Sequence, residues 1–485
     1  MERPDTPEWT RDAIFYQIFP DRFARGRDVP KPSNLEHWGA PPTFHGYQGG
    51  DLIGVVEHLD YLLDLGVNAI YFTPVFQSAS NHRYHTHDYE KVDPMLGGDA
   101  ALRRLLDAAH DRGMRVVLDG VFNHASRGFF QFHDILENGP DSPYLDWFTV
   151  RSFPLNAYRQ DVEPNYEAWW NLPALPKFNI RNPDVREYLL GVAVKWIEFG
   201  IDGWRLDVAN EIDDDEFWRE FRRRVRAANP EAYIVGEVWS DSQRWLQGDM
   251  WDAVMNYHFT RACLAFFTRG EVELAELQRT SLFPIPMPGA ETFAESIERL
   301  RGLYAPEVTA VMLNLLGSHD TARFVTLARG DVSALKLATL FQMTYPGAPS
   351  IYYGDEIGMS GGHDPANRGA FPWNDREAWD LELLHEIQRY AALRAARPAL
   401  RRGSFHVLHA RGEVFVHARK LGEETVIAAF NVGDSPARLD LPIHDQVAEG
   451  VDLVDPWSNV KHRVEGGAVH GWDVPARTGK VLATP

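Results

Sequence analysis

The chain has 485 residues, 44% of them hydrophobic and 24% charged, which is the composition of a globular protein of about three domains. Its net charge of −20 argues against nucleic acid and anionic membrane surfaces as partners, and favours a neutral substrate. A single cysteine, Cys263, excludes an intramolecular disulfide and a cysteine-based zinc site.

The N-terminal stretch MERPDTPEWTRD is polar and interrupted by proline, unlike a signal peptide, and no run approaches 18 apolar residues. We therefore expect a cytoplasmic protein that is not inserted in a membrane.

Short apolar segments alternate with helical patterns from the N-terminus to residue 398. Eight apolar strands separated by crossover connections are typical of a parallel sheet, and this number predicts an α/β fold, a (β/α)₈ TIM barrel. An open doubly wound sheet is the alternative, but no G-x-G-x-x-G follows the first strand. The predicted strands are 13–19, 67–72, 115–122, 201–208, 233–239, 251–257, 311–316 and 350–354, and helices are predicted over 50–66, 99–113 and 183–200.

Two regions depart from this alternation. Residues 124–182 are too long for a structureless loop and predict a small domain inserted after the third strand. From 399 onward, alternating segments such as VFVHARK and TVIAAFNV predict an antiparallel β-sandwich. The predicted organisation is a barrel formed by 1–123 and 183–398, an inserted domain over 124–182, and a C-terminal domain over 399–485.

Carboxylates and basic groups end several predicted strands. They occur in DGVFNH (119–124), GWRLDV (203–208), GEVW (236–239) and LLGSHD (315–320). The carboxyl ends of barrel strands meet at one rim, so we expect these side chains to converge there. A structural salt-bridge network and a metal centre are alternatives, although the residues form no local ligand motif.

Converging carboxylates suit the cleavage of a glycosidic bond, in which one group protonates the leaving oxygen and another attacks the anomeric carbon or activates water. Arg205 precedes Asp207 by two residues on one strand, so both face the same side and the cation would keep that carboxylate ionised. Glu237 has no basic neighbour in GEVW, which suits a proton donor.

These four stretches resemble the conserved segments of the α-amylase family of retaining glycoside hydrolases. LPKFN (175–179), GGDLIGV (49–55) and YYGDEIGM (352–359) resemble three more, in the family's order. The resemblance implies that Asp207 is the nucleophile, Glu237 the general acid/base and Asp320 the carboxylate that stabilises the transition state. It also implies that Arg205, His124 and His319 surround the reacting sugar and that Tyr84 stacks under it.

Within the family, VANE (208–211) and LPKFN are similar to the neopullulanase, cyclomaltodextrinase and maltogenic amylase group. This likeness implies that Asp364 and Arg368 hold the next sugar and that Trp239 faces the acceptor side. A surface ion pair for the first two residues, and core packing for Trp239, are the alternatives.

Three departures from that group modify the expectations. The barrel begins within the first fifteen residues, where the group usually has an N-terminal β domain, so we expect a monomer or a dimer unlike the family's.

The stretch RGRDVPKPS (25–33) is cationic where the group often binds calcium, so we expect no required cofactor and no metal, with Asn123 as the remaining calcium candidate. YHTHDY replaces YDTADY, but the clustered His82, His85 and His87 are interpreted as cleft wall and not as a metal site.

The sequence thus predicts a hydrolase of α-1,4-glucosidic bonds in maltooligosaccharides, cyclodextrins, pullulan or starch, with some transglycosylation. A dedicated transglycosylase, an exo-acting α-glucosidase and a catalytically inactive sugar-binding relative are the alternatives. The complete set Asp207, Glu237 and Asp320 argues against the last.

Overall fold

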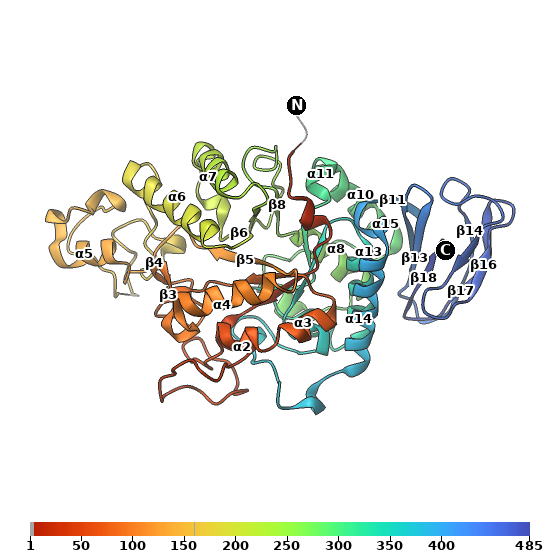
Figure 1. The fold of residues 1–485 in the computed structure, drawn as a ribbon, viewed down its shortest axis with the longest axis horizontal. Helices are drawn as coiled ribbons and strands as arrows, with labels where there is room; N and C mark the ends of the chain where they lie inside the picture. Colours follow the sequence, from red (N-terminus) through yellow and green to blue (C-terminus); the bar gives the residue numbers. More distant parts are fainter. Residues whose placement is uncertain (1–3, 160) are drawn as a thin grey trace.

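The centre of the protein is a closed barrel of parallel strands, seen in a computed structural model that describes residues 4–159 and 161–485 (Figure 1). Neighbouring strands follow the order β8-β7-β6-β5-β2-β1-β10-β9, and a parallel bridge between Met255 and Leu313 joins the two ends. The predicted barrel and its eight strands are confirmed. They are β1 (Phe15–Ile18), β2 (Ala69–Phe72), β5 (Arg115–Gly120), β6 (Gly203–Leu206), β7 (Tyr233–Gly236), β8 (Ala253–Val254), β9 (Leu313–Leu315) and β10 (Ala348–Tyr352).

Helices cover the outside of the barrel and complete its crossovers (Figure 1). The longer ones are α4 (Gly98–His110), α6 (Pro183–Glu198), α7 (Asp215–Ala228), α8 (Tyr257–Phe267), α10 (Ala290–Leu303), α13 (Val332–Thr344) and α14 (Leu381–Ala396). Shorter helices are α1 (Pro20–Phe23), α9 (Leu274–Leu277), α11 (Pro306–Thr309), α12 (Phe324–Leu327) and α15 (Pro398–Arg402).

The single helix predicted over 50–66 is wrong in its continuity, because the segment forms α2 (Leu52–Val56) and α3 (Leu59–Leu65). The chain leaves helical geometry at His58, whose φ is −118°. The imidazole Nδ1 of His58 lies 2.7 Å from the carbonyl oxygen of Gly54, so a side chain bonds the acceptor that a continuing helix would use. Apolar spacing alone does not reveal this break.

Two excursions rise from the barrel rim. The hairpin of β3 (Phe76–Ser78) and β4 (Thr86–Val92) follows β2, and the stretch between β5 and α6 carries α5 (Phe130–Asn138) and isolated β-bridges. One bridge pairs His124 with Lys177, so both ends of this inserted stretch return to the rim of the barrel. Both excursions contribute walls to the cleft described below.

The C-terminal part is an antiparallel sandwich, as predicted. Its six-stranded sheet consists of β11 (Ser404–Arg411), β12 (Val414–Leu421), β13 (Glu424–Asn431), β18 (Thr478–Ala483), β15 (Asp452–Val454) and β16 (Lys461–Arg463), and β14 (Ala437–Pro442) pairs with β17 (Ala468–Val474) in the second sheet.

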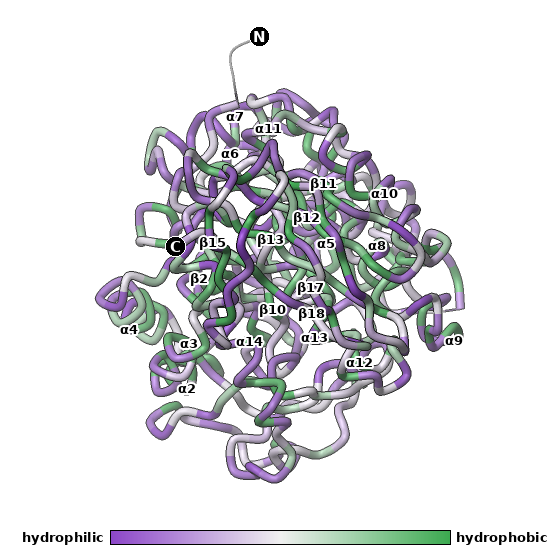
Figure 2. The backbone as a smooth tube through the Cα atoms, turned by 90° about the vertical axis from the view of Figure 1, so that its right-hand side faces the viewer, coloured by the Kyte–Doolittle hydropathy of each residue, from purple (hydrophilic) through white to green (hydrophobic). Residues whose placement is uncertain are grey.

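One face of the larger sheet packs on the barrel. Phe415 and Phe430 meet Phe341 of α13 with ring centroids 6.0 and 5.7 Å apart, and the buried Arg419 donates to the carbonyls of Thr344 and Leu400. Viewed from the side of the C-terminal part, the strands of this sheet lie across the centre of the molecule, and α4 and α9 lie at opposite edges (Figure 2). No helix of the described residues combines the length and apolarity of a membrane span.

Candidate active site

Arg205 of β6 is the centre of a buried charge cluster at the carboxyl ends of the strands. Its Nη1 donates to both carboxylate oxygens of Asp119 at 3.1 and 3.0 Å and to Oδ1 of Asp207 at 2.9 Å, and its Nη2 lies 3.1 Å from Oε2 of Glu237. Strand register explains the convergence, because Asp119 of β5 pairs directly with Arg205 and β7 leads into Glu237. The expectation that Glu237 lacks a basic neighbour is therefore wrong in three dimensions, since a guanidinium from the adjacent strand contacts it.

Glu237 has two further donors. The backbone N–H of Val208 donates to Oε2 at 2.9 Å, and the indole Nε1 of Trp239 donates to Oε1 at 3.0 Å. Trp239 in turn stacks on Tyr257, with ring centroids 3.5 Å apart and planes 7° from parallel. Trp239 also lines the cleft, so its placement is not that of an ordinary core residue.

Tyr84 and His319 form a stacked pair on the floor of the cleft, with planes 9° from parallel. The Tyr84 hydroxyl donates to Oδ2 of Asp119 at 2.8 Å and lies 2.6 Å from Nε2 of His319. Gln17 donates to Nδ1 of His319, which leaves Nε2 as the nitrogen that carries the proton and contacts Oδ2 of Asp320 at 3.1 Å. One hydrogen-bond chain therefore fixes Tyr84, His319 and Asp119 relative to one another.

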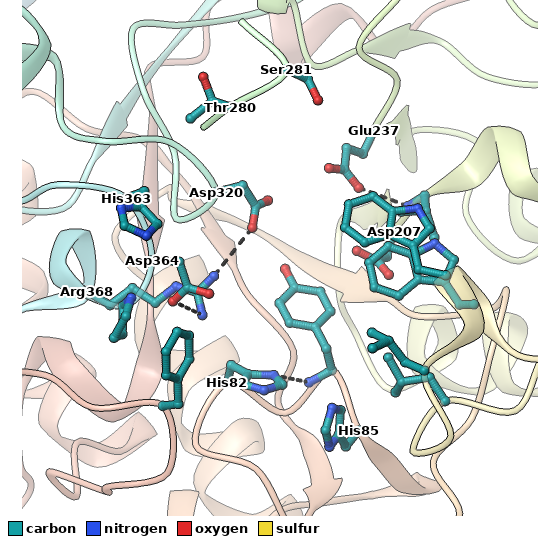
Figure 3. A pocket seen from close by; sticks show the side chains of 18 of the residues that line it. His82, His85, Asp207, Glu237, Thr280, Ser281, Asp320, His363, Asp364 and Arg368 are labelled. Atoms are coloured by element: carbon teal, nitrogen blue, oxygen red, sulfur yellow. Dashed lines mark hydrogen bonds and ion pairs between the residues drawn. The ribbon is translucent and has the colours of Figure 1, made fainter. Parts of the chain in front are cut away.

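Arg368 links Asp320 to Asp364. Its Nη2 lies 3.5 Å from Oδ1 of Asp320, its Nη1 lies 2.9 Å from Oδ1 of Asp364, and its Nε donates to the carbonyl of His319 (Figure 3). The Arg368 side chain is only 10% exposed, so this pair is part of the cleft wall and not a solvated surface ion pair.

His124 is buried on the opposite wall. Its ring stacks on Trp169 with planes 18° apart, and Trp169 stacks on Trp170, a residue that is 76% exposed. The inserted stretch thus supplies aromatic surface that extends from the buried His124 to solvent.

The histidines of NHRYHTH do not gather as a metal site, and the described residues contain no cluster of three or more His, Cys, Asp or Glu side chains suited to a metal. Nδ1 of His82 accepts the backbone N–H of Tyr84 at 3.1 Å (Figure 3), and burial lowers the pKa of His85 to about 4. His82 therefore supports the tyrosine, and both rings belong to the wall of the cleft.

Too few cations compensate the buried acids. Burial raises the pKa of Asp119 to about 6 and that of Asp320 to about 7, the latter helped by the charge of Glu237 and opposed by Arg368 and Arg205. Burial also raises the pKa of Asp207, while Arg205 acts in the opposite direction. Burial lowers the pKa of His124 to about 3, so this imidazole is neutral.

These residues surround a cavity of about 580 Å³. Figure 3 shows Asp207 and Glu237 on one side, Asp364 and Arg368 on the other, and Thr280 and Ser281 across the opening. The structure brings most of the predicted substrate and catalytic residues to its lining; Arg205 and His319 lie just beneath, in contact with Asp207 and Asp320. The predicted residues in the lining are Tyr84, His124, Asp207, Glu237, Trp239, Asp320, Asp364 and Arg368.

Several residues that line or support the cleft were not identified from the sequence. Asp119 stands at a strand end but received no role, although it accepts hydrogen bonds from Arg205, Tyr84 and Tyr71. Trp169 and Trp170 lie in NYEAWW (165–170), a stretch typical of the neopullulanase, cyclomaltodextrinase and maltogenic amylase group, but the sequence assigned neither tryptophan a place in the site. Thr280 and Ser281 carried no signal, because their segment has neither periodicity nor a motif.

The stretch 25–33 places a lysine beside a buried carboxylate. Nζ of Lys31 lies 2.9 Å from Oδ2 of the buried Asp51 and donates to the carbonyl of Met95 at 2.5 Å, so an ammonium group is the cation beside this carboxylate. Oδ1 of Asn123 is buried without a hydrogen-bond partner among the described residues.

Comparison with known proteins identifies the family. The α-amylase catalytic domain matches residues 17–392, and the neopullulanase-like C-terminal domain matches residues 405–478. A cyclomaltodextrinase from a Bacillus species is 48% identical over 429 residues, which are 88% of this chain and 73% of that protein.

Solved structures are similar to this protein over nearly the whole chain. A protein from Thermus thermophilus is 49% identical with a TM-score of 0.94, and the match covers 98% of this chain and all of that one. A debranching enzyme from Nostoc punctiforme is 49% identical with a TM-score of 0.90, and the match covers 99% of this chain and all of that one. The match over most of the chain, together with the barrel fold, establishes that this protein is a glycoside hydrolase of the α-amylase family.

Proposed function

We propose that this protein cleaves α-1,4-glucosidic bonds of maltooligosaccharides, cyclodextrins, pullulan or starch by double displacement, with some transglycosylation. The observation that carries the proposal is the single guanidinium of Arg205 in contact with both Asp207 and Glu237. It holds two carboxyl groups side by side at one end of the cleft, which suits an enzyme in which one of them attacks the sugar directly.

The chemistry follows from this arrangement. A carboxylate oxygen of Asp207 attacks the anomeric carbon while Glu237 gives its proton to the departing oxygen, which leaves a β-linked glycosyl ester on Asp207. Glu237, now ionised, takes a proton from water or from a sugar hydroxyl, whose oxygen attacks the same carbon and releases Asp207. Two inversions retain the α configuration, and Asp320 stabilises the positive charge that develops on the ring.

Cleavage of α-1,6 branch points is a second candidate. It is favoured by one observation, the match over the whole length of both chains with a protein described as a debranching enzyme. Both reactions use the same three carboxylates, so the walls of the cleft would decide between them.

Substitution of the two central carboxyl groups tests the mechanism. We expect Asp207→Asn and Glu237→Gln each to lower hydrolysis of maltoheptaose by roughly 10³-fold or more, because each removes a group that forms or breaks bonds. Circular dichroism should show that both variants keep the fold. Turnover near that of the wild type in either variant would refute the assignment.

Products separate the proposed activity from its alternatives. We expect ring opening of β-cyclodextrin, a mixture of short products from maltoheptaose, and panose from pullulan, measured by chromatography over time. Maltotriose from pullulan would indicate α-1,6 cleavage instead, and glucose as the sole product would indicate exo action. Chains longer than maltoheptaose as the main product would indicate a transglycosylase, and no product at all would indicate an inactive relative.

The pH profile tests the charge balance around Asp320. With its pKa raised to about 7, this carboxyl group gains a proton as the pH falls below 7, and it can then no longer stabilise a cationic transition state. We expect kcat/KM to decline on this acid limb. Arg368→Gln removes a charge that lowers the pKa of Asp320, so its acid limb should move to higher pH, whereas Arg368→Lys should keep it near that of the wild type. An unmoved limb in Arg368→Gln would contradict this.

We further propose that no calcium is required, because Lys31 supplies the cation beside Asp51. Wild-type activity and melting temperature should survive EDTA. Lys31→Met should lower the free energy of unfolding by about 3 kcal/mol, since it leaves a buried carboxylate without its cation. Arg27→Met, at an exposed position of the same stretch, is the matched control and should change little. Calcium-reversible loss of wild-type activity in EDTA would overturn the proposal.

A further inference from the structure

Three donors from three places in the chain hold the carboxyl group of Glu237. Oε2 accepts the N–H of Val208 and lies against the guanidinium of Arg205, whereas the indole N–H of Trp239 donates to Oε1. Among the described residues, only Trp239 donates to Oε1. The two oxygens of one carboxyl group are therefore in different surroundings.

This asymmetry determines where a proton can reside. Oε2 faces a backbone donor and a permanent cation, both of which favour negative charge on that oxygen. A proton on Glu237 is therefore more stable on Oε1. An indole N–H only donates, so it cannot accept this proton. It bonds a lone pair of Oε1 and leaves the O–H bond of the acid free for the departing glycosidic oxygen.

The indole that provides this contact is packed against a buried aromatic ring. Tyr257 covers one of its faces at 3.5 Å between centroids, and Tyr257 is 1% exposed. A ring packed in this way cannot turn its N–H away from Oε1 without opening the stack. The expected acceptor-side role of Trp239 can use only the other face.

The backbone on the Oε2 side is strained. Val208, directly after Asp207, adopts φ 38° and ψ 44°, a left-handed conformation that is a marked outlier for a β-branched residue. In this conformation its N–H donates to Glu237 at 2.9 Å. Strain of this kind persists where the surrounding structure requires it. Here the strained residue follows Asp207 and donates its N–H to Glu237.

We propose that Trp239 is a positioning residue for proton transfer: its stacked indole donates to Oε1 of Glu237 and aims the acid proton at the leaving group. The inference rests on the proposed role of Glu237 and assigns Trp239 a part in the chemical step beyond contact with sugar.

The test compares two substrates that differ only in the leaving group. Fluoride departs from α-maltosyl fluoride without full protonation, whereas the phenoxide of phenyl α-maltoside needs a proton. Trp239→Phe keeps a ring against Tyr257 and removes the N–H. We expect it to lower kcat/KM on phenyl α-maltoside by roughly 10- to 100-fold, and on the fluoride by less than about 3-fold.

Two further variants test whether the effect is due to the lost N–H of Trp239. Site-specific replacement of Trp239 by benzothienylalanine substitutes sulfur for the N–H in a bicyclic ring of the same shape, and should reproduce the result even if the phenylalanine variant folds poorly. Trp457→Phe, the same substitution in the C-terminal part, should leave both rates unchanged.

Equal losses on both substrates, or unchanged kcat/KM on both with only the transfer products altered, would overturn the proposal. Glu237→Gln in the same assay keeps the two hypotheses apart. If that variant shows no dependence on the leaving group, the role of Glu237 itself fails. If it shows the dependence and the Trp239 variants do not, only the positioning role fails.

Discussion

The buried guanidinium of Arg205 is the interaction on which the catalytic end of the barrel depends. Its side chain is inaccessible to solvent and touches Asp119, Asp207 and Glu237 from three adjacent strands. Three buried carboxylates without a cation would repel one another and carry a large desolvation cost. One arginine reduces that cost but does not cancel it, so burial still raises the pKa values of Asp119 and Asp207.

Support for the reacting groups comes from residues that do not themselves react. Asp119 orients both Arg205 and Tyr84, His82 holds the backbone of Tyr84, and Gln17 selects the tautomer of His319. Most of these contacts join different strands or loops. The cleft is therefore organised by the barrel rim as a whole, and the two excursions, the hairpin of β3 and β4 and the stretch between β5 and α6, give it its walls.

Much of this arrangement could be predicted. Apolar runs such as VNAIYF (67–72) are buried on both faces in a parallel sheet, so they mark barrel strands without further information. Polar residues that directly follow such runs must lie at the rim, which placed Asp207, Glu237 and Asp320 together. The helix predicted over 50–66 failed because the break depends on a hydrogen bond from the side chain of His58, which apolar spacing does not encode.

The sequence by itself determined the fold class, the strand ends that carry the chemistry and the family, because these depend on local periodicity and on motifs within a few residues. Only the tertiary structure decided which partner each side chain has. Neighbouring strands place Arg205 against Glu237. Lys31 forms an ion pair with Asp51, which lies twenty residues further along the chain. Tyr257, at the start of the helix after β8, stacks on Trp239. Such contacts join residues that are not neighbours in the chain, and their geometry follows from barrel closure and packing, which no local pattern contains.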